Sequence, residues 1–242
     1  MSALLAVDNV SKRFRGLVAV DRVSFEVPEG SIFAAIGPNG AGKTTLFNLI
    51  AGVFAPDAGG IAFAGERIEG LKPDHICRRG IGRTFQIVRP FPALSVEDNV
   101  IVGALLHCRH LGAARDYAHD VLRRLDLYDK RLHPAAALTL PDRKRLEVAR
   151  ALATDPKLLL LDEVMAGLRP TETDRIVAIL KELNRERGLT ILLIEHVMRA
   201  VMALAGQVLV LHHGAKIAEG APEEVVRDPA VIDSYLGAEA IE

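Results

Sequence analysis

Short apolar runs separated by turn residues dominate the first part of the chain. Residues 4–7, 23–27 and 31–36 are such runs, and their spacing predicts strands. Over residues 44–51 the apolar spacing becomes helical, and Gly52 ends the pattern. A strand, a glycine-rich loop and a helix therefore follow one another, which is the start of a β-α-β unit.

Further along, a helical middle is followed by strands that are apolar throughout. Residues 95–154 are mostly helical in pattern, with a capping box at the start. After them, the apolar runs 157–161, 190–194 and 207–212 alternate with helical segments. Such strands are typical of a parallel sheet covered on both faces. The sequence predicts an α/β fold with a parallel sheet, an antiparallel β portion and an inserted helical part.

Composition and charge narrow the classes of function. Of 242 residues, 50% are apolar and 25% charged, which is a globular composition. Lys and Arg number 30 against 31 Asp and Glu, so the basic surface of a direct nucleic-acid binder is not expected. The longest apolar stretch, residues 200–211, is too short to span a bilayer, and residues 1–8 do not resemble a secretory signal. We therefore expect a cytoplasmic chain that relies on another subunit for any membrane crossing.

A phosphate-binding motif lies between a predicted strand and a predicted helix. Residues 37–45 read GPNGAGKTT and match GxxxxGK[ST] in the context that this motif requires. Backbone N–H groups and the helix N-terminus cradle phosphate oxygens, Lys43 reaches the β and γ phosphates, and the Thr44 hydroxyl ligates Mg²⁺. The alternative is a glycine turn with a solvated lysine. The predicted nucleotide-binding residues are Gly37, Pro38, Asn39, Gly40, Ala41, Gly42, Lys43, Thr44 and Thr45.

Two carboxylates follow a second buried strand. Residues 158–163 read LLLLDE, which places Asp162 to hold Mg²⁺ and Glu163 to polarise a water for attack on the γ phosphate. An apolar run before two acids is commonly only a strand end that meets solvent. The phosphate loop upstream favours the catalytic interpretation, and kinases, GTPases, RecA-like motors and transporter ATPases stay open. The absence of an NKxD motif from the sequence weakens the GTPase interpretation.

Three further segments, taken together with these two motifs, resemble the ATP-binding cassette (ABC) family. Gln86 ends RTFQ, residues 138–150 read LTLPDRKRLEVAR, and His196 lies in IEHVM. The segments GLVAVDRVSFEV, LSVEDNV and DPAVIDSYLG resemble, more narrowly, ATPase subunits of branched-chain amino acid importers. The resemblance covers essentially the whole chain.

The resemblance implies a single ABC ATPase domain over residues 1–242. Residues 1–90 and 155–242 would form a P-loop NTPase (RecA-like) core with its β subdomain, and residues from about 91 to 154 a helical subdomain. ATP and Mg²⁺ are the implied cofactors.

The resemblance also implies roles for individual side chains. Glu163 would act as base or water-orienter, His196 would hold the γ phosphate, and Gln86 would sense that phosphate through Mg²⁺ or the attacking water. Phe14 would stack on adenine, with an ordinary strand-edge aromatic as the alternative. Mg²⁺ would be held by Thr44, Asp162 and Gln86.

The signature segment departs from the family pattern. LSGGQ, which would contact the γ phosphate bound by a partner chain, is replaced here by LTLPD over residues 138–142. Thr139 keeps a hydroxyl, but Pro141 has no N–H to donate, and Asp142 would bring negative charge toward a polyanion. The segment predicted to act in trans is Thr139, Leu140, Pro141 and Asp142. We expect the helix to survive, its phosphate contact to be lost, and an unlike partner with an intact signature to be more useful than a second copy.

The importer resemblance implies further partners and a location. A second ABC ATPase subunit, in a heterodimer or a homodimer, two transmembrane permeases and, indirectly, a periplasmic solute-binding protein would work with this chain. It would sit peripherally on the cytoplasmic face of the inner membrane, and nucleic acid would not be a partner. The cargo would be branched-chain amino acids or a related small polar or aromatic acid. The alternatives are a soluble ABC-type switch and a largely regulatory nucleotide-binding subunit.

Two other segments carry open interpretations. Residues 87–92, with Phe91, either border a groove for a short cytoplasmic helix of the membrane subunit or anchor a loop by burial. Arg143, Lys144 and Arg145 are most simply a solvated helix face, with an approach of one of them to nucleotide as the alternative.

Overall fold

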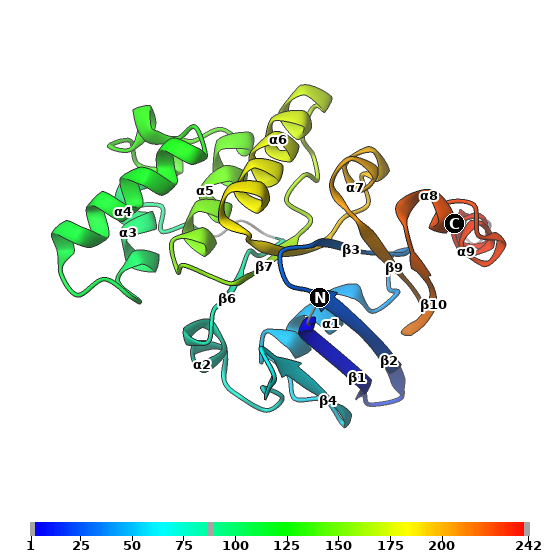
Figure 1. Cartoon of the computed structure of the whole chain (residues 1–242). Coiled ribbons are helices and arrows are strands. Elements are labelled where there is room, and N and C mark those ends of the chain that lie inside the picture. The colour runs from blue at the N-terminus through cyan, green and yellow to red at the C-terminus, as the bar shows by residue number, and fades with distance from the viewer. Residues whose placement is uncertain (1–2, 87–89, 240–242) are drawn as a thin grey trace.

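The computed structural model of the chain describes residues 3–86 and 90–239, and in this part the chain forms two β-sheets surrounded by helices (Figure 1). One sheet is four-stranded and antiparallel, in the order β2-β1-β4-β5. Its strands are β1 (Ala3–Phe14), β2 (Leu17–Pro28), β4 (Ala58–Phe63) and β5 (Glu66–Arg67). The predicted antiparallel β portion is confirmed.

The other sheet has six strands in the order β10-β9-β3-β8-β7-β6. All neighbouring pairs are parallel except β9 and β10, which form an antiparallel hairpin at one edge. The strands are β3 (Ile32–Ile36), β6 (Ile81–Arg83), β7 (Leu158–Asp162), β8 (Thr190–Ile194), β9 (Gln207–His212) and β10 (Ala215–Gly220). The predicted parallel sheet is thereby confirmed.

Helices lie on both sides of this sheet, and α3, α4 and α5 gather at the end away from the antiparallel sheet (Figure 1). They follow β6 and precede β7, whereas the separate helical subdomain with ends near 91 and 154 stays a prediction. In the described residues no helix is both long and apolar enough to cross a bilayer. The helices are α1 (Lys43–Ile50), α2 (Pro73–Arg78), α3 (Val96–Ala104), α4 (Leu111–Arg124), α5 (Leu140–Leu152), α6 (Pro170–Arg187), α7 (Met198–Leu204), α8 (Pro222–Val225) and α9 (Pro229–Glu239).

The two faces of the six-stranded sheet bury different cores. Side chains alternate between faces along a strand. Phe33 and Ala35 of β3 therefore pack in one core with residues of α1 and the antiparallel sheet. Ile32, Ala34 and Ile36 join α3 to α7 on the opposite face. All five of these side chains are almost completely buried, which explains why such strands read as continuous apolar runs.

The sheet topology brings the predicted site together. The strands β3, β6, β7 and β8 are parallel, so their carboxyl ends lie along one edge. The segments that follow these ends carry the phosphate loop, Gln86, Glu163 and His196. Ligands of open α/β sheets bind at this edge, and the candidate site is expected there.

Candidate nucleotide-binding site

The phosphate loop is a backbone cradle that only glycine permits at two points. Gly37 and Gly42 have φ angles of 146° and 101°, and a Cβ at these positions would lie 2.1 Å from the Leu211 carbonyl oxygen and 2.3 Å from that of Ala19. The loop therefore passes directly against its neighbours, with its N–H groups free to turn inward at the start of α1.

Lys43 places a cation inside this cradle. Its ammonium donates to the carbonyl oxygens of Gly37 at 2.7 Å and Pro38 at 2.9 Å, and the residue is 8% exposed. Burial lowers the pKa of Lys43, while the nearby carboxylates of Glu163 and Asp162 act in the opposite direction. A buried cation at a helix N-terminus is suited to phosphate oxygens.

The phosphate loop forms one wall of a groove of about 660 Å³. Residues 39–45 line it together with Phe14, Gln86, Glu163 and the turn residue His213. The Phe14 ring is 37% exposed and meets Phe54 edge-on, with 5.1 Å between centroids. The groove thus joins an exposed aromatic ring to the phosphate cradle, as the predicted adenine contact requires.

The three predicted catalytic side chains lie together. Gln86 donates from Nε2 to Oε2 of Glu163 at 2.8 Å, and Nδ1 of His196 lies 4.0 Å from Oε1 of Glu163. The backbone of Glu163 is in the left-handed region, with φ of 50°, and its N–H donates to the Ile194 carbonyl at 3.0 Å. This unusual conformation turns the Glu163 side chain toward the groove instead of continuing β7.

Asp162 has an oxygen suited to a cation. The residue is 1% exposed, and its Oδ1 is buried with no hydrogen-bond partner among the described residues. Burial raises the pKa of Asp162, while Arg83, 3.3 Å from Oδ2, opposes this rise. An unpartnered buried carboxylate oxygen at the end of β7 fits the donor chemistry that Mg²⁺ prefers.

Arg83 is a site residue that the sequence analysis did not single out. Its guanidinium joins Asp162 to Asn48 of α1, donating to Oδ1 of Asn48 at 2.7 Å. It thereby connects the strand end that carries Asp162 to the helix that carries Lys43. In the sequence, the feature that indicates a role for Arg83 in the site is its position three residues before Gln86.

The signature segment keeps its helix. α5 begins at Leu140, with Thr139 as N-cap and Pro141 in the first turn, where proline is tolerated. Among the described residues that line the nucleotide groove of this chain, none belongs to residues 139–142. The role of this segment in a partner's site stays a prediction.

The expectation that Asp142 points negative charge at a polyanion is wrong for this chain. The Asp142 side chain is 3% exposed and pairs with Lys130 and Arg145, and the Thr139 hydroxyl donates to Oδ2 at 2.9 Å. Burial favours a higher pKa, but the bonds from Lys130 and Thr139 outweigh it and lower the pKa of Asp142. The buried Arg145 and the partly exposed Lys130 therefore neutralise this carboxylate within its own chain.

The interpretation of residues 143–145 as a solvated face holds for Arg143, which is exposed, and is wrong for the other two residues. Lys144 is 5% exposed and Arg145 9% exposed. Lys144 donates to the backbone carbonyl of Glu163 at 2.8 Å, while Arg145 bonds Asp142. α5 turns these charges inward because carbonyls and carboxylates within the fold provide their partners.

Glu195 is a second site residue that the sequence analysis missed. It is 0% exposed, and its Oε1 accepts from the backbone N–H of Met165 at 2.9 Å. Its Oε2 is buried without a hydrogen-bond partner in the described part of the chain. Burial raises the pKa of Glu195 to about 7. In the sequence, the feature that indicates Glu195 as a site residue is its position directly after the apolar strand of residues 190–194 and directly before His196.

The raised pKa of Glu195 makes stability depend on pH. The folded state binds its proton more tightly than the unfolded state, for which the ordinary value is 4.5. The free energy of unfolding should therefore fall as pH rises from 4.5 to about 7. Relative to Glu195→Gln, the wild type should lose on the order of 3 kcal/mol across this range. Urea unfolding of both proteins at each pH measures this difference, and parallel curves would contradict it.

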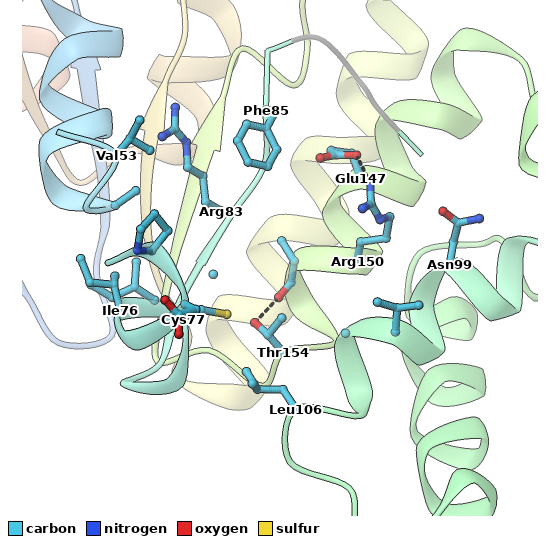
Figure 2. Close-up of a pocket in the computed structure, with 18 residues that line it drawn as sticks. Val53, Ile76, Cys77, Arg83, Phe85, Asn99, Leu106, Glu147, Arg150 and Thr154 are labelled. Carbon is cyan, nitrogen blue, oxygen red and sulfur yellow. Dashed lines mark hydrogen bonds and ion pairs between the residues drawn. The ribbon is translucent and has the colours of Figure 1, made fainter. Parts of the chain in front are cut away.

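A second groove of about 430 Å³ lies between α2, β6, α3 and α5 (Figure 2). Phe85, Val53 and Leu106 contribute exposed apolar surface to it, and Glu147 pairs with Arg150 at its wall (Figure 2). Phe85, which lines this groove, directly precedes Gln86 in the sequence.

Phe91 lies close to the wall of this second groove. Its backbone is anchored by Asn99, whereas its ring is 44% exposed and lies 5.0 Å from the Arg150 guanidinium carbon. Anchoring by burial of the ring is therefore wrong. The segment 87–89 of the same prediction lies outside the described residues.

Comparison with known proteins agrees with this geometry. The family model described as ABC transporter matches residues 20–166. The chain belongs to the ABC transporter family. A second family model, described as branched-chain amino acid ATP-binding cassette transporter, matches residues 215–241 of the cassette.

Relatives of the cassette match along nearly its whole length. The high-affinity branched-chain amino acid transport ATP-binding proteins BraF of Pseudomonas aeruginosa and LivG of Salmonella typhimurium are 39% and 41% identical, and each alignment covers 97% of this chain and 98% of the relative. The lipopolysaccharide export system ATP-binding protein LptB of Acidithiobacillus ferridurans is 35% identical, with 98% of both chains covered.

Solved structures confirm the P-loop cassette fold. An ATP-binding cassette of an ABC transporter in its ADP conformation has a TM-score of 0.89 and 31% identity, covering 98% of this chain and 100% of that one. A dimeric bacterial ABC transporter cassette has a TM-score of 0.83 and 25% identity, covering 90% of this chain and 98% of its own. The cassette is an ATP-binding and ATP-hydrolysing subunit of an ABC transporter.

Proposed function

We propose that this cassette drives an importer for branched-chain amino acids or a related small polar or aromatic acid. The observation that carries the cargo assignment is the match of residues 215–241 to the branched-chain amino acid cassette family, together with the names of BraF and LivG. The similarity to a lipopolysaccharide export protein indicates that the ATPase core alone does not select a cargo.

In the proposed reaction, a water attacks the γ phosphate of ATP held by the phosphate loop. The water oxygen bonds to phosphorus while the bond from phosphorus to the bridging β-γ oxygen breaks, so ADP leaves with the electron pair. Glu163 takes the proton of the water or orients it, with Gln86 hydrogen-bonded to its carboxylate. His196, on the other side of Glu163, holds the γ phosphate, and Lys43 stabilises the charge that develops on it.

Mg²⁺ is the implied metal of this site. Thr44, Asp162 and Gln86 would hold it, and the unpartnered Oδ1 of Asp162 fits this role. When bound, the metal neutralises phosphate charge as a Lewis acid. Arg83 keeps Asp162 in place from the opposite oxygen.

We further propose a head-to-tail dimer with unequal sites. The site that uses the Lys43 and Glu163 of this chain would turn over when a partner provides an intact signature. In the opposite site, Pro141 would offer no N–H to the phosphate, and the Thr139 hydroxyl already donates to Asp142. A lost preorganised donor costs roughly a hundredfold in rate, which favours a heterodimer.

The groove of Figure 2 would receive a short cytoplasmic segment of a permease. Its exposed apolar side chains, Phe85, Val53 and Val102, suit an apolar helix face, and Arg83 extends from its wall to the Mg²⁺-binding Asp162. The cassette would then sit peripherally on the cytoplasmic face of the inner membrane beneath two permeases, with a periplasmic solute-binding protein delivering cargo to them.

Transport by reconstituted vesicles tests this function. Vesicles carry the cassettes, with their permeases, facing the lumen, and the solute-binding protein is added outside. Uptake of labelled leucine, isoleucine or valine is expected with enclosed ATP and should fall to background with a non-hydrolysable ATP analogue. ATP hydrolysis without uptake of any of the three, or of small polar and aromatic acids offered in the same assay, would contradict the cargo assignment.

A further inference from the structure

Two buried side chains hold the turn that carries Glu163, and neither takes part in the reaction described above. Lys144 donates to the Glu163 carbonyl at 2.8 Å, and Glu195 accepts from the Met165 N–H at 2.9 Å. Lys144 is 5% exposed and Glu195 is 0% exposed. The backbone of the turn is therefore bound on both sides of Val164 by charged groups.

This turn needs external support. The φ of 50° at Glu163 is a left-handed conformation, which costs an ordinary residue free energy and persists only where the surroundings impose it. Within the turn, the Glu163 carbonyl accepts only a long bond, 3.3 Å, from the N–H of Ala166. The shorter bond from Lys144 is charge-assisted and stronger.

Lys144 and Glu195 lie on the face of the six-stranded sheet that is opposite to the phosphate loop. In β8, Ile191 and Leu193 face the core that includes α5, so alternation places Glu195 on this same face. Leu192 and Ile194 face the core that includes α1. Lys144 and Glu195 thus approach the turn that carries Glu163 from the face opposite to α1, and neither is among the residues that line the groove beside the phosphate loop.

The charges around Lys144 explain why it stays in place. Burial lowers the pKa of Lys144, and the carboxylates of Glu195, Glu163, Asp162 and Glu147 oppose that change. These acidic groups offset part of the cost of burying the ammonium.

We propose that Lys144 is a positioning residue for hydrolysis, because it fixes the backbone of Glu163 so that the carboxylate meets the attacking water. The inference rests on the proposed catalytic role of Glu163. Since α5 begins at the signature segment, the same helix that would contact a partner's nucleotide also holds the catalytic turn of its own chain. A small displacement of a reacting group costs rate far more than it costs binding.

The test is Lys144→Met in the assembled transporter, because methionine keeps an unbranched side chain but removes the donor. We expect kcat, counted per nucleotide site titrated with a fluorescent ATP analogue, to fall about tenfold. The KM for ATP should stay within about twofold, since the phosphate cradle is untouched. Counting titrated sites prevents partial unfolding from imitating this result. Lys181→Met, an exposed lysine of α6, is the matched control.

If Lys144→Met does not fold, a double variant tests the same inference. Lys144→Met removes the cation that opposes the rise in the pKa of Glu195. Lys144→Met with Glu195→Gln removes both ionisable groups and keeps an amide oxygen for the Met165 N–H. This double variant should show the same loss of kcat per site. A wild-type kcat in either folded variant, or a rise in KM matching the loss, overturns the inference. If Glu163→Gln itself keeps full activity, the proposed function fails instead.

Discussion

Replacing Glu163 with glutamine is expected to remove more than half of the ATPase activity of the assembled transporter while ATP binding is retained. Glutamine has the same size but cannot accept a proton, and loss of a general base costs roughly a hundredfold or more at the affected site. Because the opposite site is proposed to be slow, nearly all turnover should depend on this one carboxylate.

The measurement is phosphate release at saturating Mg·ATP, with nucleotide affinity measured on the same samples. Glu182→Gln, which changes an exposed glutamate of α6, is the matched control and should behave as wild type. If more than about half of the activity remains in Glu163→Gln, the unequal dimer is disproved, because the signature of this chain would then support hydrolysis in its partner's site.

Replacing Lys43 with alanine should weaken ATP binding by roughly a hundredfold, because charge-assisted hydrogen bonds to the phosphates are lost. Lys43 is the buried cation within the phosphate loop, so solvent or a neighbouring lysine cannot replace it. Turnover should fall with affinity.

Isothermal titration of the purified chain with Mg·ATP measures this effect. Thermal unfolding of the same sample serves as a control, since the carbonyls of Gly37 and Pro38 lose their buried donor. Lys181→Ala, on an exposed face of α6, should leave affinity unchanged. A Lys43→Ala chain that is folded and binds ATP as wild type would contradict the nucleotide site itself.

The fold and the centre of the site were predictable for a local reason. The phosphate loop is one contiguous segment whose glycines, lysine and threonine each have a chemical requirement, and it stands between a strand and a helix that are visible as periodic patterns. Glu163 and His196 follow apolar strands, and parallel strands end at a common edge. The convergence of these residues with Gln86 follows from that topology.

The environments of the charged residues on α5 were not predictable in this way. Asp142 and Lys144 read as polar positions near a helix start, yet both are buried. Their partners, Lys130 and the carbonyl of Glu163, are separated from them in sequence and belong to other elements. Whether a charge meets solvent or a partner depends on how the helix is rotated against its neighbours, which helical periodicity alone does not specify.

The sequence by itself determined the strand-loop-helix order, the phosphate cradle and the identity of the acids that follow the strands, because each of these depends on residues that are adjacent in the chain. Only the tertiary structure decided that Arg83 supports Asp162, that Lys130 pairs with Asp142, and that Lys144 and Glu195 hold the turn that carries Glu163. These are contacts between separate elements, and burial and electrostatics act through distance in space, not through distance along the chain.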